Sequence, residues 1–232
     1  MERTRTWAGA VAALSLALPL HAQGTRPAIA VLPFENGGSY GQDKENFEAL
    51  QVGLPLILSS TLAAHPGARI VEAGAMRDAM SRQQLGPGRR FDAASAIAVA
   101  KGAGARYAVT GSFADFYGKF RINARVVDAE SGQILKVVSN DDPSLQDRAQ
   151  LGAILQLVSE RLVAAVGLPP MPGDAAARLR AVPTEALIEL SRGLMFESRG
   201  DQAKAADAFR RALGIYPDYP EARDGLARVR GA

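Results

Sequence analysis

The stretch RYAVTGSFADFYGKFRINARVVDAESGQILKVV, residues 106–138, decides the fold. Apolar and polar residues alternate in its middle, and the apolar positions are Phe120, Ile122, Ala124 and Val126. A period of two indicates strands that bury one face. Gly118 and the run Glu130-Ser131-Gly132 supply the residues that tight turns need. The stretch therefore predicts a meander of three antiparallel strands, a framework without an obvious reactive group.

Upstream of the meander, strands and helices are expected to alternate. The nearly continuous apolar run 28–34 predicts a central strand buried on both faces, with Pro33 at its end. A helix from about Lys44 should be kinked or split at Pro55. A short strand at 69–72 and two helices follow, at 74–85 and from Asp92, which can cap the second one, to about Lys101.

Downstream, a long helix is predicted from the Asp141-Asp142-Pro143 turn to Val166. The order of elements over residues 26–168 is then β-α-β-α-α-β-β-β-α. This order indicates an α/β (α+β) domain, in which helices flank a mixed sheet that contains the antiparallel meander. The prolines of residues 169–182 indicate a stiff linker to a C-terminal segment, residues 183–232.

The amino terminus carries a pattern typical of secretory signal peptides. Arg3 and Arg5 precede an apolar run over residues 7–20, and small or apolar residues lead up to Ala22. The alternative is a membrane anchor, but a spanning helix needs about 20 apolar residues. We expect residues 1–22 to be removed, with cleavage after about Ala22. The chain contains no cysteine, so it can carry neither a lipid on an N-terminal cysteine nor a disulfide. Once the signal is removed, we expect no transmembrane segment and a periplasmic or secreted protein, for which a peripheral place at the outer membrane is one option.

Composition restricts the chemistry that is available. The net charge is +3 and the arginines are scattered among acidic residues, whereas a nucleic-acid-binding protein shows a clustered basic stripe. His65 is the one histidine beyond the predicted signal peptide, and its place at a helix end indicates a structural role in which an imidazolium complements the helix dipole. Asp141 and Asp142 form the only tight acidic pair, for which capping is the expected role. The loop 86–90 could cradle an anion, but a mobile surface loop is the preferred interpretation. We therefore expect no cofactor, no metal and no enzymatic activity.

The C-terminal segment contains seven residues that match a tetratricopeptide (TPR) pattern, Gly193, Phe196, Gly200, Ala205, Phe209, Ala212 and Pro217. The resemblance implies a helical hairpin in which small residues let two helices approach and phenylalanines fill the space between them. Only one full repeat is present, and a single repeat cannot bury its apolar face alone.

That apolar face defines the candidate binding residues, Leu187, Leu190 and Leu194, with Glu197 at the rim. Three occupants are open for it: the α/β domain, a protein partner, or a second copy of the chain.

Three segments together resemble a known group of envelope proteins. They are IAVLPFEN at 29–36, VTGSF at 109–113 followed by FRINARVVDAESGQIL at 120–135, and the closing long helix. Over roughly residues 28–166 the chain is similar to the periplasmic α/β domain of the CsgG/HfaB curli-secretion family, the FlgO proteins and the amino-terminal domain of TolB. The resemblance implies a non-catalytic role in assembly, secretion or scaffolding.

We therefore expect a periplasmic adaptor or scaffold that binds a protein partner in the cell envelope or associates with itself, and that does not bind nucleic acid. One alternative is a subunit of an outer-membrane secretion channel. The least favoured alternative is a hydrolase that works through carboxylates, since no pair of acidic residues has a distinctive spacing.

Overall fold

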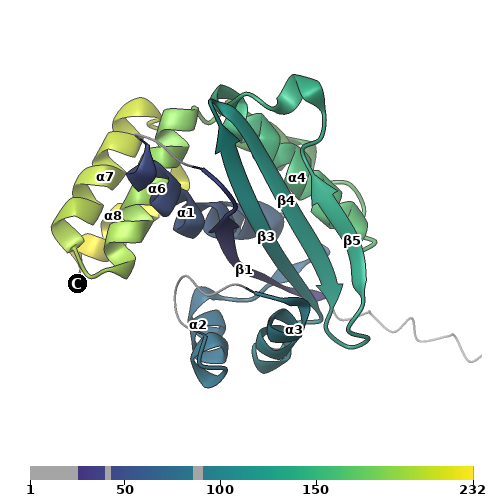
Figure 1. Cartoon of the computed structure of the whole chain (residues 1–232). Coiled ribbons are helices and arrows are strands. Elements are labelled where there is room, and N and C mark those ends of the chain that lie inside the picture. The colour runs from purple at the N-terminus through teal and green to yellow at the C-terminus, as the bar shows by residue number, and fades with distance from the viewer. Residues whose placement is uncertain (1–25, 40–42, 86–90, 232) are drawn as a thin grey trace, which may run out of the picture.

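The structure, a computed structural model, describes residues 26–39, 43–85 and 91–231, so the predicted signal peptide and the loop 86–90 lie outside it. Its centre is a five-stranded mixed sheet in the order β2-β1-β3-β4-β5 (Figure 1). The strands are β1 (Ala28–Asn36), β2 (Arg69–Ile70), β3 (Tyr107–Phe116), β4 (Lys119–Asp128) and β5 (Ile134–Ser139). β1 runs parallel to β2 and β3, whereas β3, β4 and β5 form an antiparallel meander. The predicted fold class is confirmed.

The meander forms as its alternation predicts. Phe120, Ile122, Ala124 and Val126 are fully buried on one face of β4, while the residues between them are exposed. Phe113 on β3 stacks on Phe120, with 5.5 Å between ring centroids. The β3–β4 turn consists of Tyr117 and Gly118, both with positive φ, 54° and 86°. Glycine adopts this conformation without cost, whereas for the tyrosine it is an uncommon one.

β1 differs from its prediction at Pro33. The strand continues to Asn36, and its register against β3 shifts between Val31 and Phe34. Pro33 therefore lies within this irregularity instead of ending the strand, because a residue without an N–H is tolerated where the ladder is already interrupted.

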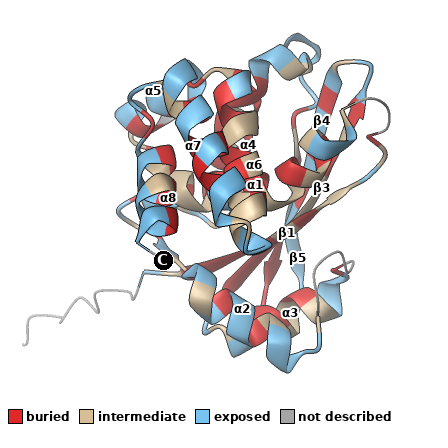
Figure 2. Cartoon of the chain, turned by 90° about the vertical axis from the view of Figure 1, so that its left-hand side faces the viewer, coloured by how far each residue is buried: buried red, intermediate tan, exposed pale blue. Residues whose placement is uncertain are grey.

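Helices cover both faces of the sheet (Figure 2). α1 (Lys44–Ala63) and α4 (Leu151–Ala165) share the larger core with the buried side chains of the meander. α2 (Ala73–Arg82) and α3 (Ala93–Gly102) close a smaller, alanine-rich core against the other face. Asp92 caps α3, since its carboxylate accepts a hydrogen bond from Ser95 N. α1 is continuous through Pro55 and is not split there.

Two predicted boundaries are wrong. The segment after Asp142 first forms two short 3₁₀ turns, Pro143–Leu145 and Arg148–Gln150, and α4 begins only at Leu151. The predicted linker contains helix α5 (Gly173–Ala181), which packs on α4 so closely that a Cβ on Gly152 would lie 2.6 Å from the carbonyl oxygen of Leu179. Ala175, Leu179 and Val182 recur at helical spacing and are buried, which outweighs the prolines before them.

The chain ends in three packed helices, α6 (Thr184–Ser198), α7 (Gln202–Ile215) and α8 (Pro220–Arg230). They lie at the side of the molecule next to α1, on the opposite side from β5 (Figure 1). Their buried residues belong to the same continuous core as α1, α4 and the meander.

Candidate protein-binding surface

The α6–α7 hairpin packs through its small residues, as the sequence pattern predicts. Phe209 is fully buried, and its ring occupies the space where a Cβ on Gly193 or Gly225 would lie, at 2.4 and 2.6 Å from ring carbons. Ala205 and Ala212 on α7 are also fully buried. Phe196 is half-buried, with the Lys204 ammonium 5.6 Å from its ring centroid. Gly200 has a φ of +78° at the turn between the helices, and Pro217 is exposed beyond them.

The predicted partner-binding leucines are already covered. Leu187 and Leu190 are 0% and 1% exposed, and α6 packs directly on α1. The two helices meet so closely that a Cβ on Gly53 would lie 1.9 Å from Ser191 Oγ. Of the three occupants open for this face, the α/β domain is therefore the one observed. The prediction that Leu187 and Leu190 bind a partner is wrong, because both side chains are buried in the chain's own core.

The other two predicted binding residues are also engaged within the chain. Leu194 is half-buried and packs against the same core. Glu197 pairs with α8, since its carboxylate accepts hydrogen bonds from Nε and Nη2 of Arg228, at 2.9 and 3.0 Å. All four predicted partner-binding residues therefore make contacts within the chain itself.

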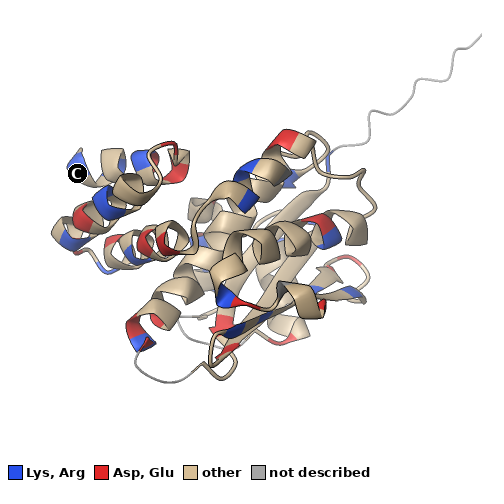
Figure 3. Cartoon of the chain, turned by 90° about the horizontal axis from the view of Figure 1, so that it is seen from above, with Lys and Arg blue, Asp and Glu red and all other residues tan. Residues whose placement is uncertain are grey.

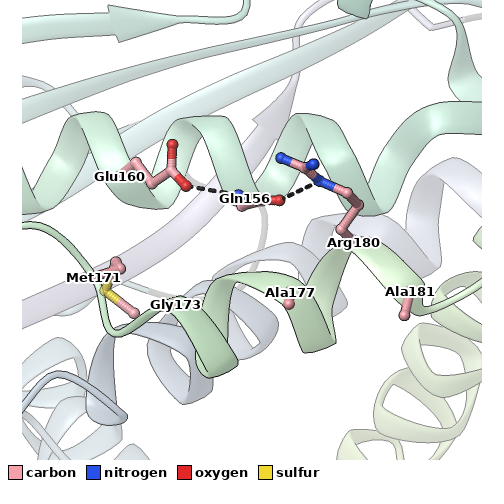
Figure 4. Close-up of a pocket in the computed structure, with 7 residues that line it drawn as sticks. All are labelled: Gln156, Glu160, Met171, Gly173, Ala177, Arg180 and Ala181. Carbon is pink, nitrogen blue, oxygen red and sulfur yellow. Dashed lines mark hydrogen bonds between the residues drawn. The ribbon is translucent and has the colours of Figure 1, made fainter.

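A shallow groove of about 430 Å³ lies between α4 and α5 (Figure 4). Its polar side chains satisfy one another: Arg180 Nε donates to Gln156 Oε1 at 2.7 Å, and Gln156 Nε2 donates to Glu160 Oε1 at 2.6 Å. The remaining lining residues are Met171, Gly173, Ala177 and Ala181. This arrangement joins α5 to α4.

A second, smaller cleft of about 290 Å³ surrounds Arg148, beside the turn of the β3–β4 hairpin. Arg148 Nη1 lies 3.0 Å from Asp43 Oδ2 and 3.3 Å from the buried Asp115 Oδ2. Asp115 Oδ1 accepts from Gly118 N, and the hydroxyl of Thr184 donates to Arg148 O. The arginine therefore ties the hairpin to the first turns of α1 and α6, which is a structural role.

Several acidic side chains act as helix or turn caps; of the acidic pair predicted to cap, Asp142 does so, whereas Asp141 pairs with Arg161. Hydrogen bonds from Ser95, Ser144 and Lys204 lower the pKa of Asp92, Asp142 and Asp201 respectively. A hydrogen bond from Arg161 lowers the pKa of Asp141. In the described part of the chain, no three acidic or histidine side chains cluster as metal ligands would.

His65 has a structural role, but not the predicted one. Its ring is buried, Nδ1 accepts from Gly67 N at 3.0 Å, and Nε2 lies 2.9 Å from the carbonyl oxygen of Pro169. With Nδ1 accepting, the proton belongs on Nε2, which donates to Pro169 O. A neutral ring therefore joins the end of α1 to the segment before α5, and no imidazolium on the helix dipole is involved.

Uncovered surface remains on the far side of the meander. α2 and α3 pack near β1 and one end of β3 and β4, and no helix of the described residues lies over the rest of that face (Figure 2). We name the exposed residues there the open sheet face: Phe116, Lys119, Arg121, Arg125, Ile134 and Val137. Strand register places Val137 opposite Arg125 and Ile134 opposite Val127, while Phe116 pairs with Lys119 at the hairpin end of the same face, about 20 Å away along β4. The helices α6–α8 differ, because cations and anions alternate along them (Figure 3).

The apolar members of this face are unusually exposed. Ile134, Val137 and Phe116 are 50%, 59% and 58% exposed, and Tyr117 at the hairpin tip is fully exposed. β5 is also an edge strand, because only β4 pairs with it. Adjacent exposed apolar side chains on a free edge mark an interaction surface more often than single ones do. The sequence contained a signal for this: the run ILKVV at 134–138 is apolar at both odd and even positions, as in a strand that has two faces to cover.

Comparisons with known proteins give weak likenesses. No family model matches the chain, and no curated protein does. Among solved structures, the LpoB C-terminal domain from Salmonella enterica covers 52% of this chain and 87% of its own, with 18% identity and a TM-score of 0.39. The match to TolB from Acinetobacter baumannii covers 62% of this chain and 29% of the TolB chain, with 19% identity and a TM-score of 0.41. The match to lipoprotein GNA1162 from Neisseria meningitidis covers 60% of this chain and 93% of the lipoprotein, with 17% identity and a TM-score of 0.35.

Likeness at this level assigns neither a family nor an activity to the chain. The TPR and CsgG/FlgO resemblances stay predictions. TolB, to which the sequence motifs are similar, is also among the three structures reported above. Within the described residues, no helix combines the length and the apolar character that crossing a membrane requires.

Proposed function

We propose that the chain is an exported, non-catalytic protein of the cell envelope that binds another protein through the open sheet face. The signal-peptide pattern of residues 1–22 supports export, and the motif resemblance supports an envelope role. The finer assignment, to curli-type assembly and secretion, rests on those motifs alone.

One observation carries the binding proposal. Phe116, Ile134 and Val137 are each at least half exposed and share one face of the sheet. In an ordinary soluble protein such side chains are scattered singly, and a group of them beside a free strand indicates a covered surface. The helical hairpin offers no comparable group, since its leucines are in the core.

Site-specific photo-cross-linking in the exporting cell tests the proposal. A photoreactive amino acid at Val137 should give a discrete adduct with another protein. The matched control is Ile215 on α7, which is 42% exposed and lies on the opposite side of the molecule. Adducts of equal yield at both positions, or none at Val137 and Phe116, would contradict binding through this face.

A further inference from the structure

Among the described strands longer than two residues, β5 is the one that is paired on a single side. The short β2 forms the other edge of the sheet, and β5, with six residues, ends the order after β4. Such a strand presents outward-facing N–H and C=O groups that can accept a further strand. The register against β4 shifts at Val126 and Val127, opposite the start of β5. Residues 136–139 pair regularly with β4, and the carbonyl oxygen of Ser139 already accepts a hydrogen bond from Arg161, so the part of the edge best suited to accept another strand is centred on Val137.

The side chains around this edge are positive on both faces of the sheet. Arg125 lies directly opposite Val137 on the open sheet face, and Lys119 and Arg121 continue the row. Lys136 is exposed on the other face of β5. Within the described part of the chain, none of these four cations has a carboxylate within 4 Å. The charge of Arg121 contributes only slightly to the lowered pKa of the nearby Asp141.

Charge decides between the possible occupants of the edge. A second copy of the chain, paired β5 to β5, would bring the Lys136 side chains of the two edge strands near each other, with Arg125 one strand further in on each copy, and like charges across adjacent strands are destabilising. An acidic strand would place carboxylates in those positions, and its apolar side chains would cover Ile134 and Val137.

We infer that β5 accepts an extended acidic segment of a protein partner as a sixth strand of the sheet. This inference rests on the proposed function and specifies its binding mode. Main-chain hydrogen bonds would supply the pairing, and the four cations would select the sequence that pairs.

The probe is a labelled peptide of about ten residues in which glutamate alternates with valine and threonine. Fluorescence anisotropy with the full chain should show saturable binding that weakens as salt is raised. Hydrogen exchange should slow at the amides of β5. Arg125→Glu should weaken binding about tenfold, because it replaces an attraction by a repulsion of similar size. Arg230→Glu on α8 makes the same change of charge on the opposite side and should leave binding unchanged.

Two further peptides separate strand pairing from charge alone. A lysine-for-glutamate version should bind at least about tenfold more weakly, and a version N-methylated at alternate residues should lose the exchange protection of β5. Equal binding of either version would overturn the inference. Arg121→Glu repeats the charge test if Arg125→Glu lowers the melting temperature.

The remaining outcomes also decide. If the acidic peptide does not bind but Val137 still cross-links to a protein, the sixth strand is refuted and the proposed function stands. If neither occurs, both are refuted. If phosphatidylglycerol vesicles, and not the peptide, bind in a manner that Arg125→Glu abolishes, the face binds a membrane surface and the inference is wrong.

Discussion

The contact between α1 and α6 makes a sharp test of how the helical segment is attached. Replacing Gly53 by alanine would place the new Cβ 1.9 Å from Ser191 Oγ, 2.4 Å from its Cβ and 2.9 Å from its Cα. The serine hydroxyl cannot simply rotate away, because the Cβ and the backbone are also too close. The hydroxyl moreover donates to the carbonyl oxygen of Leu187 at 2.7 Å. The two helices must therefore separate.

The size of the effect follows from two opposing terms. Overpacking of this kind costs up to about 3 kcal/mol. Alanine in place of glycine within a helix stabilises by about 1 kcal/mol. The free energy of unfolding should then fall by about 2 kcal/mol, which lowers the melting temperature by about 4–8 °C for a chain of this size.

Thermal unfolding followed by circular dichroism measures the change. Gly74→Ala on α2 is the matched control, since nothing lies within 4 Å of the new Cβ, and it should be neutral or stabilising. Adding Ser191→Gly to Gly53→Ala removes the two nearest atoms and should recover part of the loss, whereas Ser191→Ala leaves the 2.4 Å contact and should recover little. A Gly53→Ala protein as stable as the parent would refute the close packing of α6 on α1.

Three other substitutions test single groups. Tyr219 is buried, burial raises the pKa of its phenol, and the hydroxyl has no hydrogen-bond partner in the described structure. Tyr219→Phe should therefore raise the free energy of unfolding by up to about 1 kcal/mol. A loss of stability would instead reveal an unseen hydrogen-bond partner. His65→Ala should cost about 2–4 kcal/mol in denaturant unfolding, because it leaves Gly67 N and Pro169 O unpaired and opens a cavity; a change below about 1 kcal/mol would contradict the bridge. Hydrogen bonding with Lys204 lowers the pKa of Asp201 in the folded state, so the stabilisation by this carboxylate is present above the ordinary pKa and is lost as the pH falls through the lowered value. Asp201→Asn should therefore make the free energy of unfolding depend less on pH in the acid range. An unchanged pH dependence would argue against the cap.

Local patterns predicted the parts of the fold that local forces determine. The alternation around Phe120 and Ile122 and the turn at Gly118 were enough for the meander, and Asp92 was enough for the start of α3. The helix α5 was missed because the prolines before Gly173 were given more weight than the apolar spacing of Ala175 and Leu179.

Long-range choices could not be predicted from the sequence. The apolar face of α6 was recognised as needing a cover, but its spacing does not say whether α1 or another molecule provides it. The open sheet face was missed for a related reason. Whether Val137 is exposed depends on how much of the sheet α2 and α3 reach, and this is a property of the assembled layers.

The common core of α1 and α6 bears on how the protein can be dissected. A chain stopped before Thr184 would leave bare the side of α1 around Gly53 that α6 covers, and the product would tend to aggregate. Grafting the last three helices onto an unrelated carrier would strand Leu187 and Leu190 in water. A loss of partner binding in a truncated form of this protein could therefore reflect poor solubility. Single-residue substitutions in the intact chain test partner binding more directly.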